Sequence, residues 1–374
     1  MKNPFKPTAG ARPPIVVGRS TILDSFKEGL EDGSGSPGLL TILTGPRGIG
    51  KTVMLSEAED AARARGWVVI SETATEGLLG RIGEAARLHL NELGTNSPGA
   101  RLSSIGVAGF TVGFTLPPEQ QVALRHVFED LLNALAGHET GLLISVDEIH
   151  AANRSELTEL AALVQHMIRE DLPIGLIAGG LPAAVSDLLD EGVSTFLRRA
   201  ERVDLHSASE ADVRAALAAT FEQTGIAASP EHLDRMAAAT GGYPFLIQLV
   251  GYHVWRLARH NGGTTDAIVA EGLDSARKRL GSTVLASAFN GLSGIDKTFL
   301  LKMAEDDGPS RIGDIAARMG ETTQYAGVYR RRLMDAGVIE SPGHGLVDFA
   351  VPHLRSYLRE HAALQSDLDS TSLE

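Results

Sequence analysis

The chain has 374 residues, of which 43% are apolar, and a formal net charge of −13. Its length predicts two or three domains, and its apolar content excludes a disordered protein. The negative charge argues against a protein coated with nucleic acid but leaves room for a local basic surface. Because cysteine is absent, disulfides and thiolate metal sites are excluded, and a reducing cytoplasm is the natural compartment.

The N-terminal region, residues 1–14, is rich in proline and lacks the apolar stretch of a secretory signal, so it is predicted to form an extended arm. No run of about 18 apolar residues follows, and we therefore expect a cytoplasmic protein with no membrane partner. The pattern over residues 20–30 predicts a helix, for which Ser20 is a plausible cap.

Residues 45–52 read G-P-R-G-I-G-K-T and fit the phosphate-binding loop (P-loop) pattern G-x-x-x-x-G-K-[ST] at every fixed position. An apolar run at 39–44 predicts a buried strand before the loop, and residues 53–62 predict a helix after it. Glycines let several N–H groups face one anion, and the positive end of the helix points to the same place. An ordinary glycine-rich turn is the alternative, which this context disfavours. We therefore predict that a nucleotide is bound by Gly45, Pro46, Arg47, Gly48, Ile49, Gly50, Lys51, Thr52 and Val53.

The last residues of the loop carry side chains suited to ATP with Mg²⁺. Lys51 is predicted to act catalytically at the β- and γ-phosphates, and Thr52 to ligate the metal. A second apolar run ends in two carboxylates, of which Asp147 is predicted to hold Mg²⁺ and Glu148 to polarise the attacking water. His150 is either a neighbour of the γ-phosphate or, as is more common, a loop residue bonded to backbone.

Strands alternate with helices through residue 206, which predicts an α/β domain over residues 15–206 with a parallel sheet flanked by helices. The strand patterns lie at 67–70, 142–146, 174–178 and 203–205, and the helical patterns at 78–94, up to about 135, and 154–170. Alternating apolar residues and glycines at 105–116 predict a β-hairpin insertion.

Beyond residue 206 the strand patterns stop. Helical patterns at 209–222, 230–240 and 244–260 predict a helical lid domain over residues 207–285. Helices at 297–305, 311–319 and 325–336, followed by a hairpin at 338–340 and 346–349, are typical of a winged helix over residues 292–358. The tail, residues 365–374, is acidic and expected to fray.

A winged helix usually places its third helix in the major groove of DNA. Here that helix carries Arg330, Arg331 and Arg332, of which we expect Arg330 to be the best exposed, whereas Val328 and Leu333 should face inward. The segment holds eight Lys and Arg against nine Asp and Glu, so affinity for double-stranded DNA would be weak and salt-sensitive. Protein docking or autoinhibition is the alternative role.

Taken together, these motifs resemble the AAA+ and STAND branch of P-loop ATPases, most closely the archaeal-type and origin-recognition (Orc1/Cdc6-like) ATPases. The resemblance rests on the P-loop, Asp147-Glu148, a V-V-G-R element at 16–19, a G-G-Y-P element at 241–244 and the C-terminal winged helix. It implies hydrolysis of ATP to ADP and phosphate with Mg²⁺, and it adds Gly18, Arg19 and Pro244 to the nucleotide site. No N-K-x-D segment is present, which disfavours guanine specificity.

The chain also departs from that family. The first sensor, a polar residue after the fourth strand, is replaced by Ala178-Gly179-Gly180, and the second-sensor arginine is missing from 244–254, with Arg256 the nearest basic residue. An arginine finger, which completes the site of a neighbouring subunit, would lie in the cluster formed by Arg198, Arg199 and Arg202. Local ion pairs with Glu201 and Asp204 are the alternative role for these arginines.

The function predicted from the sequence is an ATPase that couples nucleotide state to DNA or to a protein client. A nucleotide-dependent homo-oligomer would fit an arginine finger. Two alternatives remain open: a switch that binds ATP but hydrolyses it very slowly, and a transposition or prophage accessory ATPase. The absent sensor favours the switch, and Glu148 favours turnover.

Overall fold

The computed structural model describes residues 2–8, 11–95, 118–190, 196–286, 289 and 291–360. It divides into two compact units. The sheet unit comprises Arg19–Gly45 and Lys51–Leu205, and the helical unit comprises Met1–Gly18, Pro46–Gly50 and His206–Glu374. The predicted hairpin at 105–116 and the acidic tail lie outside the described residues.

The sheet unit contains a five-stranded parallel sheet in the order β2-β3-β4-β1-β5, which confirms the predicted α/β class. Its central strands are continuous apolar runs because both faces are covered, as is usual in parallel sheets. Leu43 and Ile42 face opposite sides of the sheet and are both buried. The strands are β1 (Leu40–Thr44), β2 (Val68–Thr73), β3 (Leu142–Asp147), β4 (Ile174–Gly180) and β5 (Glu201–Asp204).

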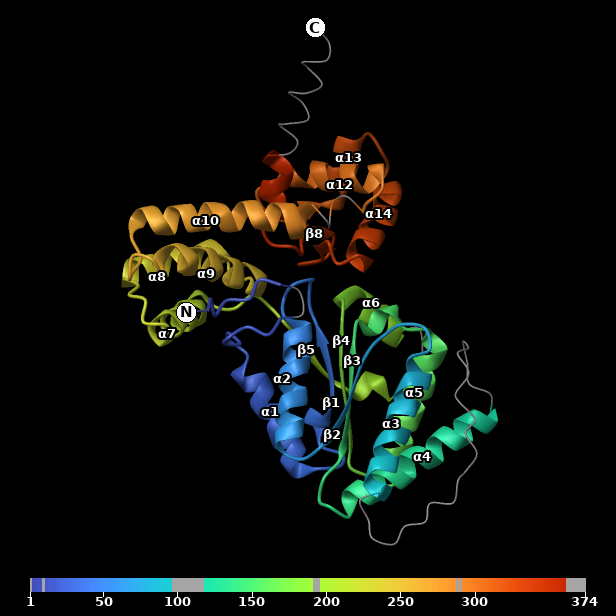
Figure 1. Ribbon diagram of the computed structural model, residues 1–374. Coiled ribbons are helices and arrows are strands. Elements are labelled where there is room, and N and C mark those ends of the chain that lie inside the picture. The colour runs from blue at the N-terminus through green and yellow to red at the C-terminus, as the bar shows by residue number, and fades with distance from the viewer. Residues whose placement is uncertain are drawn as a thin grey trace. The chain divides into compact units, whose positions relative to one another are not determined.

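Helices cover both faces of this sheet (Figure 1). One face packs against α1 (Ser20–Asp32) and α2 (Lys51–Ala64), and the other against α3 (Leu78–Thr95), α4 (Pro118–Ala136) and α5 (Arg154–Arg169). The short helices η1 (Pro37–Leu39), η2 (Ile149–Ala151) and η3 (Leu197–Arg199), together with α6 (Pro182–Asp190), complete the unit. Helix α1 begins at Ser20 as predicted, but its N-cap is Arg19 and no side chain caps it, so the capping role of Ser20 was wrong.

The helical unit begins with α7 (Glu210–Gln223), α8 (Pro230–Thr240), α9 (Pro244–Ala258) and α10 (Asp266–Leu280), followed by the π-turn η4 (Gly281–Leu285). The helix α10 was not predicted, because few large apolar residues mark its buried face. Its Gly272 lies against α9, where an added Cβ would come within 2.5 Å of Val254 Cγ2. Helices α9 and α10 therefore pack closely through a glycine, and α10 needs no continuous stripe of large apolar residues to form this contact.

The C-terminal part of this unit contains α12 (Gly294–Ala304), β6 (Ser310–Arg311), α13 (Ile312–Met319), α14 (Thr323–Asp335), β7 (Ile339–Glu340) and β8 (Leu346–Phe349). The three strands pair antiparallel in the order β6-β8-β7. The helices and the hairpin match the sequence patterns, whereas β6 was not predicted because it spans only two residues.

The orientation of α14 differs from the prediction. Val328 is 58% exposed, so its expected inward position was wrong, whereas Leu333 is fully buried as expected. Ala326 and Leu333 define the buried face, and at 100° per residue Val328 falls about 200° away from Ala326, on the opposite side. Arg330 falls near the buried face and is only partly exposed, so the expectation that it is the best exposed arginine was also wrong.

The N-terminal arm docks on the helices of its own unit. Phe5 is 3% exposed and lies 5.8 Å, between ring centroids, from Phe221. Asn3 Nδ2 donates to the Tyr252 carbonyl at 3.0 Å, which fixes the chain just before the buried ring. Within the described ranges, no helix combines the length and apolar character needed to cross a bilayer.

Candidate nucleotide-binding site

The P-loop leaves the end of β1 and enters α2, as the motif requires. Helix α2 starts at Lys51, so its first N–H groups and its positive end lie at the loop. Gly48 and Gly50 have φ values of 75° and 99°, which side-chain-bearing residues rarely adopt. The backbone therefore takes the tight path that directs N–H groups toward an anion.

Lys51 and Thr52 both have defined partners in the sheet unit. Lys51 is 6% exposed, and its Nζ donates to the Gly45 carbonyl at 2.7 Å. Thr52 Oγ1 donates to Asp147 Oδ2 at 2.6 Å, across the boundary between α2 and β3. The structure thus brings the two predicted metal ligands together, and an Mg²⁺ ion prefers oxygen ligands such as this hydroxyl and carboxylate.

The two carboxylates after β3 are separated by the backbone conformation. Asp147 Oδ1 accepts from the Glu148 N–H at 2.8 Å, and Glu148 has φ 53° and ψ 41°. A left-handed conformation at a residue other than glycine is uncommon and costs roughly 1 kcal/mol or more. It turns the Glu148 side chain away from the strand direction, where it is 44% exposed and 3.2 Å from His150 Nε2.

The end of β4 leaves little space for side chains. A Cβ on Gly179 would lie 3.2 Å from Asp147 Oδ1, and a Cβ on Gly180 would lie 2.6 Å from Val185 Cγ2. A side chain at Gly180 would collide with Val185 and Ile149, whereas one at Gly179 would need only a small shift of Asp147. The space beside these two glycines is occupied by Asp147 and by Ile149 of the following segment.

A polar pocket of about 380 Å³ adjoins Thr52 and Asp147 in the sheet unit. Arg81 lies in its wall and is held by Glu72 at 2.7 Å and by the Thr73 carbonyl at 2.9 Å. Arg81 was not predicted from the sequence, because it belongs to no motif and comes to the pocket only through the packing of α3 beside β2. The pocket thus places polar side chains beside Thr52 and Asp147.

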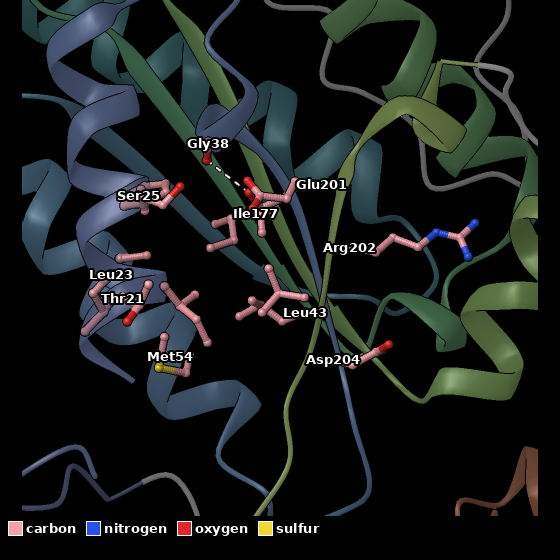
Figure 2. Close-up of a pocket in the computed structure, with 15 residues that line it drawn as sticks. Thr21, Leu23, Ser25, Gly38, Leu43, Met54, Ile177, Glu201, Arg202 and Asp204 are labelled. Carbon is pink, nitrogen blue, oxygen red and sulfur yellow. Dashed lines mark hydrogen bonds between the residues drawn. The ribbon is translucent and has the colours of Figure 1, made fainter. Parts of the chain in front are cut away.

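A second pocket, of about 410 Å³, lies in the sheet unit between α1, α2 and the strands β1, β4 and β5 (Figure 2). Its wall is largely apolar, with Leu43, Met54 and Ile177 among its side chains. Thr41 Oγ1 donates to the Gly38 carbonyl at 3.0 Å, and the Arg202 side chain extends away from the apolar residues. Lys51 and Asp147 are not among the residues that line it, so it does not include the predicted phosphate-binding and metal-binding side chains.

Within the helical unit, the tip of the P-loop contacts the G-G-Y-P element. Tyr243 is fully buried, and its hydroxyl donates to the Arg47 carbonyl at 3.0 Å. Burial raises the pKa of Tyr243 to about 12, so the hydroxyl remains a donor at neutral pH. A Cβ on Gly48 would lie 2.0 Å from that hydroxyl, and a Cβ on Gly50 would lie 4.0 Å from Pro244 Cγ. Tyr243 was overlooked as a loop-contacting residue, although it lies between two residues of the quoted element.

Two further residues predicted for the site, Gly18 and Arg19, lie on either side of the boundary between the two units. A Cβ on Gly18 would lie 3.1 Å from Asp212 Oδ2 within the helical unit. In the sheet unit, Arg19 precedes α1, and burial lowers the pKa of its guanidinium.

The arginine cluster lies at η3 and β5 of the sheet unit. Arg198 and Arg199 are both exposed, and Arg198 Nε donates to the Leu189 carbonyl at 2.7 Å. Asp204, suggested as a local partner for the arginines, accepts a hydrogen bond from Thr44 Oγ1. The bond to the Leu189 carbonyl therefore restrains the guanidinium of Arg198, although both residues are exposed.

Comparisons with known proteins agree with this geometry. Residues 15–177 match the family described as AAA ATPase domain, and residues 282–358 match a domain of unknown function, DUF8462. A search of curated proteins finds no match.

Solved structures share the fold at low sequence identity. A Walker-type ATPase of Pyrococcus abyssi is 15% identical with a TM-score of 0.68, covering 93% of this chain and 97% of its own. The ORC2 protein of Aeropyrum pernix, in ADPNP–ADP complexes, is 16% identical with a TM-score of 0.60, covering 96% and 98%. CDC6P from Pyrobaculum aerophilum is 15% identical with a TM-score of 0.50, covering 95% and 96%. With the P-loop geometry and the family match, residues 15–177 form an AAA-type P-loop ATPase domain.

Proposed function

We propose that this protein binds ATP with Mg²⁺ in the loop 45–52 and hydrolyses it to ADP and phosphate. The observation that carries the proposal is the direct bond between Thr52 Oγ1 and Asp147 Oδ2, 2.6 Å long, which joins the two halves of a P-loop metal site. The A. pernix ORC2 protein, which shares the fold, was solved with ADPNP and ADP, and this supports an adenine nucleotide.

Each residue then has a separate task. Lys51 exchanges the Gly45 carbonyl for the β- and γ-phosphates, which are stronger, charged acceptors. Thr52 and Asp147 hold Mg²⁺, which when bound neutralises charge on the phosphates. Glu148, turned away from the strand, accepts the proton of the attacking water. Gly18, Arg19 and Pro244 are proposed to border the nucleotide, as the family resemblance implies.

Removing the lysine tests nucleotide binding. Lys51→Ala is expected to weaken binding of an ATP analogue with Mg²⁺ roughly 10- to 100-fold, because a hydrogen bond to a charged group contributes about 1.5–3 kcal/mol. Equilibrium titration with a labelled analogue measures it. Lys27→Ala removes the same charge from the surface of α1 and should leave affinity unchanged. Equal affinity of folded Lys51→Ala and the native protein would refute the proposed site.

We further propose that the C-terminal elements α12, α13, α14 and the β7–β8 hairpin form a winged helix that binds double-stranded DNA. Arg331 is exposed on α14, on the side opposite Ala326 and Leu333. The other two arginines are engaged within the protein: Arg330 Nη2 donates to Ser341 Oγ at 3.2 Å, and Arg332 Nη2 to Asp296 Oδ2 at 3.1 Å. Arg331 is therefore our candidate for a phosphate contact.

The DNA proposal predicts a change in salt dependence. Arg331→Ala should reduce the magnitude of the salt slope of binding by about one and weaken all duplexes similarly, because one phosphate contact is lost. Gel shifts over a salt series, with Lys302→Ala on α12 as the control, measure it. If the full chain does not bind DNA even at low salt, the C-terminal segment instead binds a protein partner or acts as an autoinhibitory domain.

A slow ATP-dependent switch is the second candidate function. The observation that favours it is the end of β4, where glycines leave no side-chain donor for the γ-phosphate. Comparing turnover of the native protein with that of Glu148→Gln separates the switch from the ATPase.

A further inference from the structure

The segment after β3 folds back on itself and brings His150 beside Glu148. Glu148, whose backbone is in the left-handed conformation, is followed by the short helix η2. There the Ala151 N–H donates to the Glu148 carbonyl at 2.7 Å. Ile149 is 1% exposed and anchors this turn in the core. The backbone from Glu148 to Ala151 is therefore fixed, and with it the direction in which His150 projects.

The imidazole of His150 connects two groups of the site. Its Nδ1 accepts from the Leu181 N–H at 3.4 Å, directly after β4, and its Nε2 lies 3.2 Å from Glu148 Oε2. With Nδ1 as an acceptor, the neutral ring carries its proton on Nε2 and donates it to the carboxylate. The side chain of His150 is 17% exposed, whereas that of Glu148 is 44% exposed, so the fixed ring restrains the freer carboxylate.

The glycines of β4 make this arrangement possible. A Cβ on Gly180 would lie 2.8 Å from Ile149 Cγ2 and 3.6 Å from His150 Nδ1. A larger residue there would push η2 and its histidine away from the end of the strand. Glycine therefore occupies the strand end at which the family resemblance implies a polar sensor. His150, from the neighbouring loop, bonds to the backbone of the next residue, Leu181.

We propose that His150 is the positioning residue for Glu148: it holds one carboxylate oxygen by the Nε2–H bond and leaves the other to take the proton of the attacking water. This inference rests on the proposed hydrolysis by Glu148. A carboxylate fixed in the correct orientation avoids the loss that a misplacement of about 1 Å causes in a proton-transfer step.

The test measures kcat, KM and equilibrium ATP binding for the full chain with three substitutions. His150→Ala should lower kcat roughly 10- to 100-fold and leave binding unchanged, because only the placement of Glu148 is lost. His150→Gln keeps an acceptor for Leu181 N–H and a donor for Glu148 and should recover most of kcat. His150→Phe keeps the ring but neither bond and should remain as slow as His150→Ala. Thermal melting confirms that each variant is folded.

The Glu148→Gln background provides a second measurement. If His150 acts through Glu148, adding His150→Ala to Glu148→Gln should cost no further turnover. The inference is overturned if His150→Ala leaves kcat unchanged or raises it, if His150→Phe restores kcat as well as His150→Gln does, or if the losses multiply in the double variant. A native protein that binds ATP without measurable turnover overturns both this inference and the proposed hydrolysis, whereas normal turnover with an inert His150→Ala overturns the inference alone.

Discussion

Glu148→Gln is expected to lower ATP turnover roughly 10²-fold or more while leaving ATP binding intact, because glutamine keeps the shape of the side chain but cannot accept the proton of water. The Glu148 N–H bond to Asp147 and the contact with His150 are available to either residue, so the loop should keep its conformation. Steady-state phosphate release and equilibrium binding of ATP, measured on the same preparation, separate the two effects.

The matched control for this substitution is Glu57→Gln, which makes the same chemical change elsewhere in the sheet unit, on α2. It should leave turnover within twofold of the native value, roughly the scale of a surface substitution. If Glu148→Gln and the native protein hydrolyse ATP equally slowly, Glu148 is not the general base, and the slow switch becomes the better description.

Arg199→Ala is expected to abolish any rise in turnover per subunit with protein concentration, without weakening ATP binding. An arginine supplied to a neighbouring site contributes roughly 10³–10⁵ in rate where such a finger operates. Both arginines are exposed, but Arg198 Nε is bonded to the Leu189 carbonyl, so the larger effect is expected at Arg199. Turnover over a concentration series, with sedimentation at each point, measures it.

Two further variants serve as an alternative candidate and as a control. Arg198→Ala tests another candidate of the cluster, and Arg87→Ala removes an arginine that pairs with Glu84 on α3 and should change nothing. If specific activity stays constant as the protein concentration rises, whether the protein assembles or remains monomeric, no arginine finger is supplied to a neighbouring subunit. Retention of the rise in Arg199→Ala and its loss in Arg198→Ala would assign the finger to Arg198.

The elements of the fold were predictable where local pattern and burial agree. Strands β1, β3 and β4 are apolar runs that both faces of the sheet bury, and the P-loop has fixed residues at fixed spacing. Helix α10 and strand β6 escaped prediction, because a helix packed through Gly272 and a two-residue strand leave little periodicity to detect. The inward face of α14 was misjudged because Val328 and Leu333 were assigned to one apolar stripe, although residues five apart on a helix lie about 140° from each other.

The chemistry of the loop 45–52 and of the carboxylate pair was predicted from the sequence alone, because that prediction needs only residue type and short spacing. Only the tertiary structure showed that Thr52 meets Asp147 and that Tyr243 bonds the Arg47 carbonyl. It also placed His150 between Glu148 and the end of β4. These contacts join residues that are distant along the chain or depend on a left-handed turn at Glu148, and chain packing decides both. A histidine three residues after an aspartate has no assigned partner until the neighbouring strand end is in place.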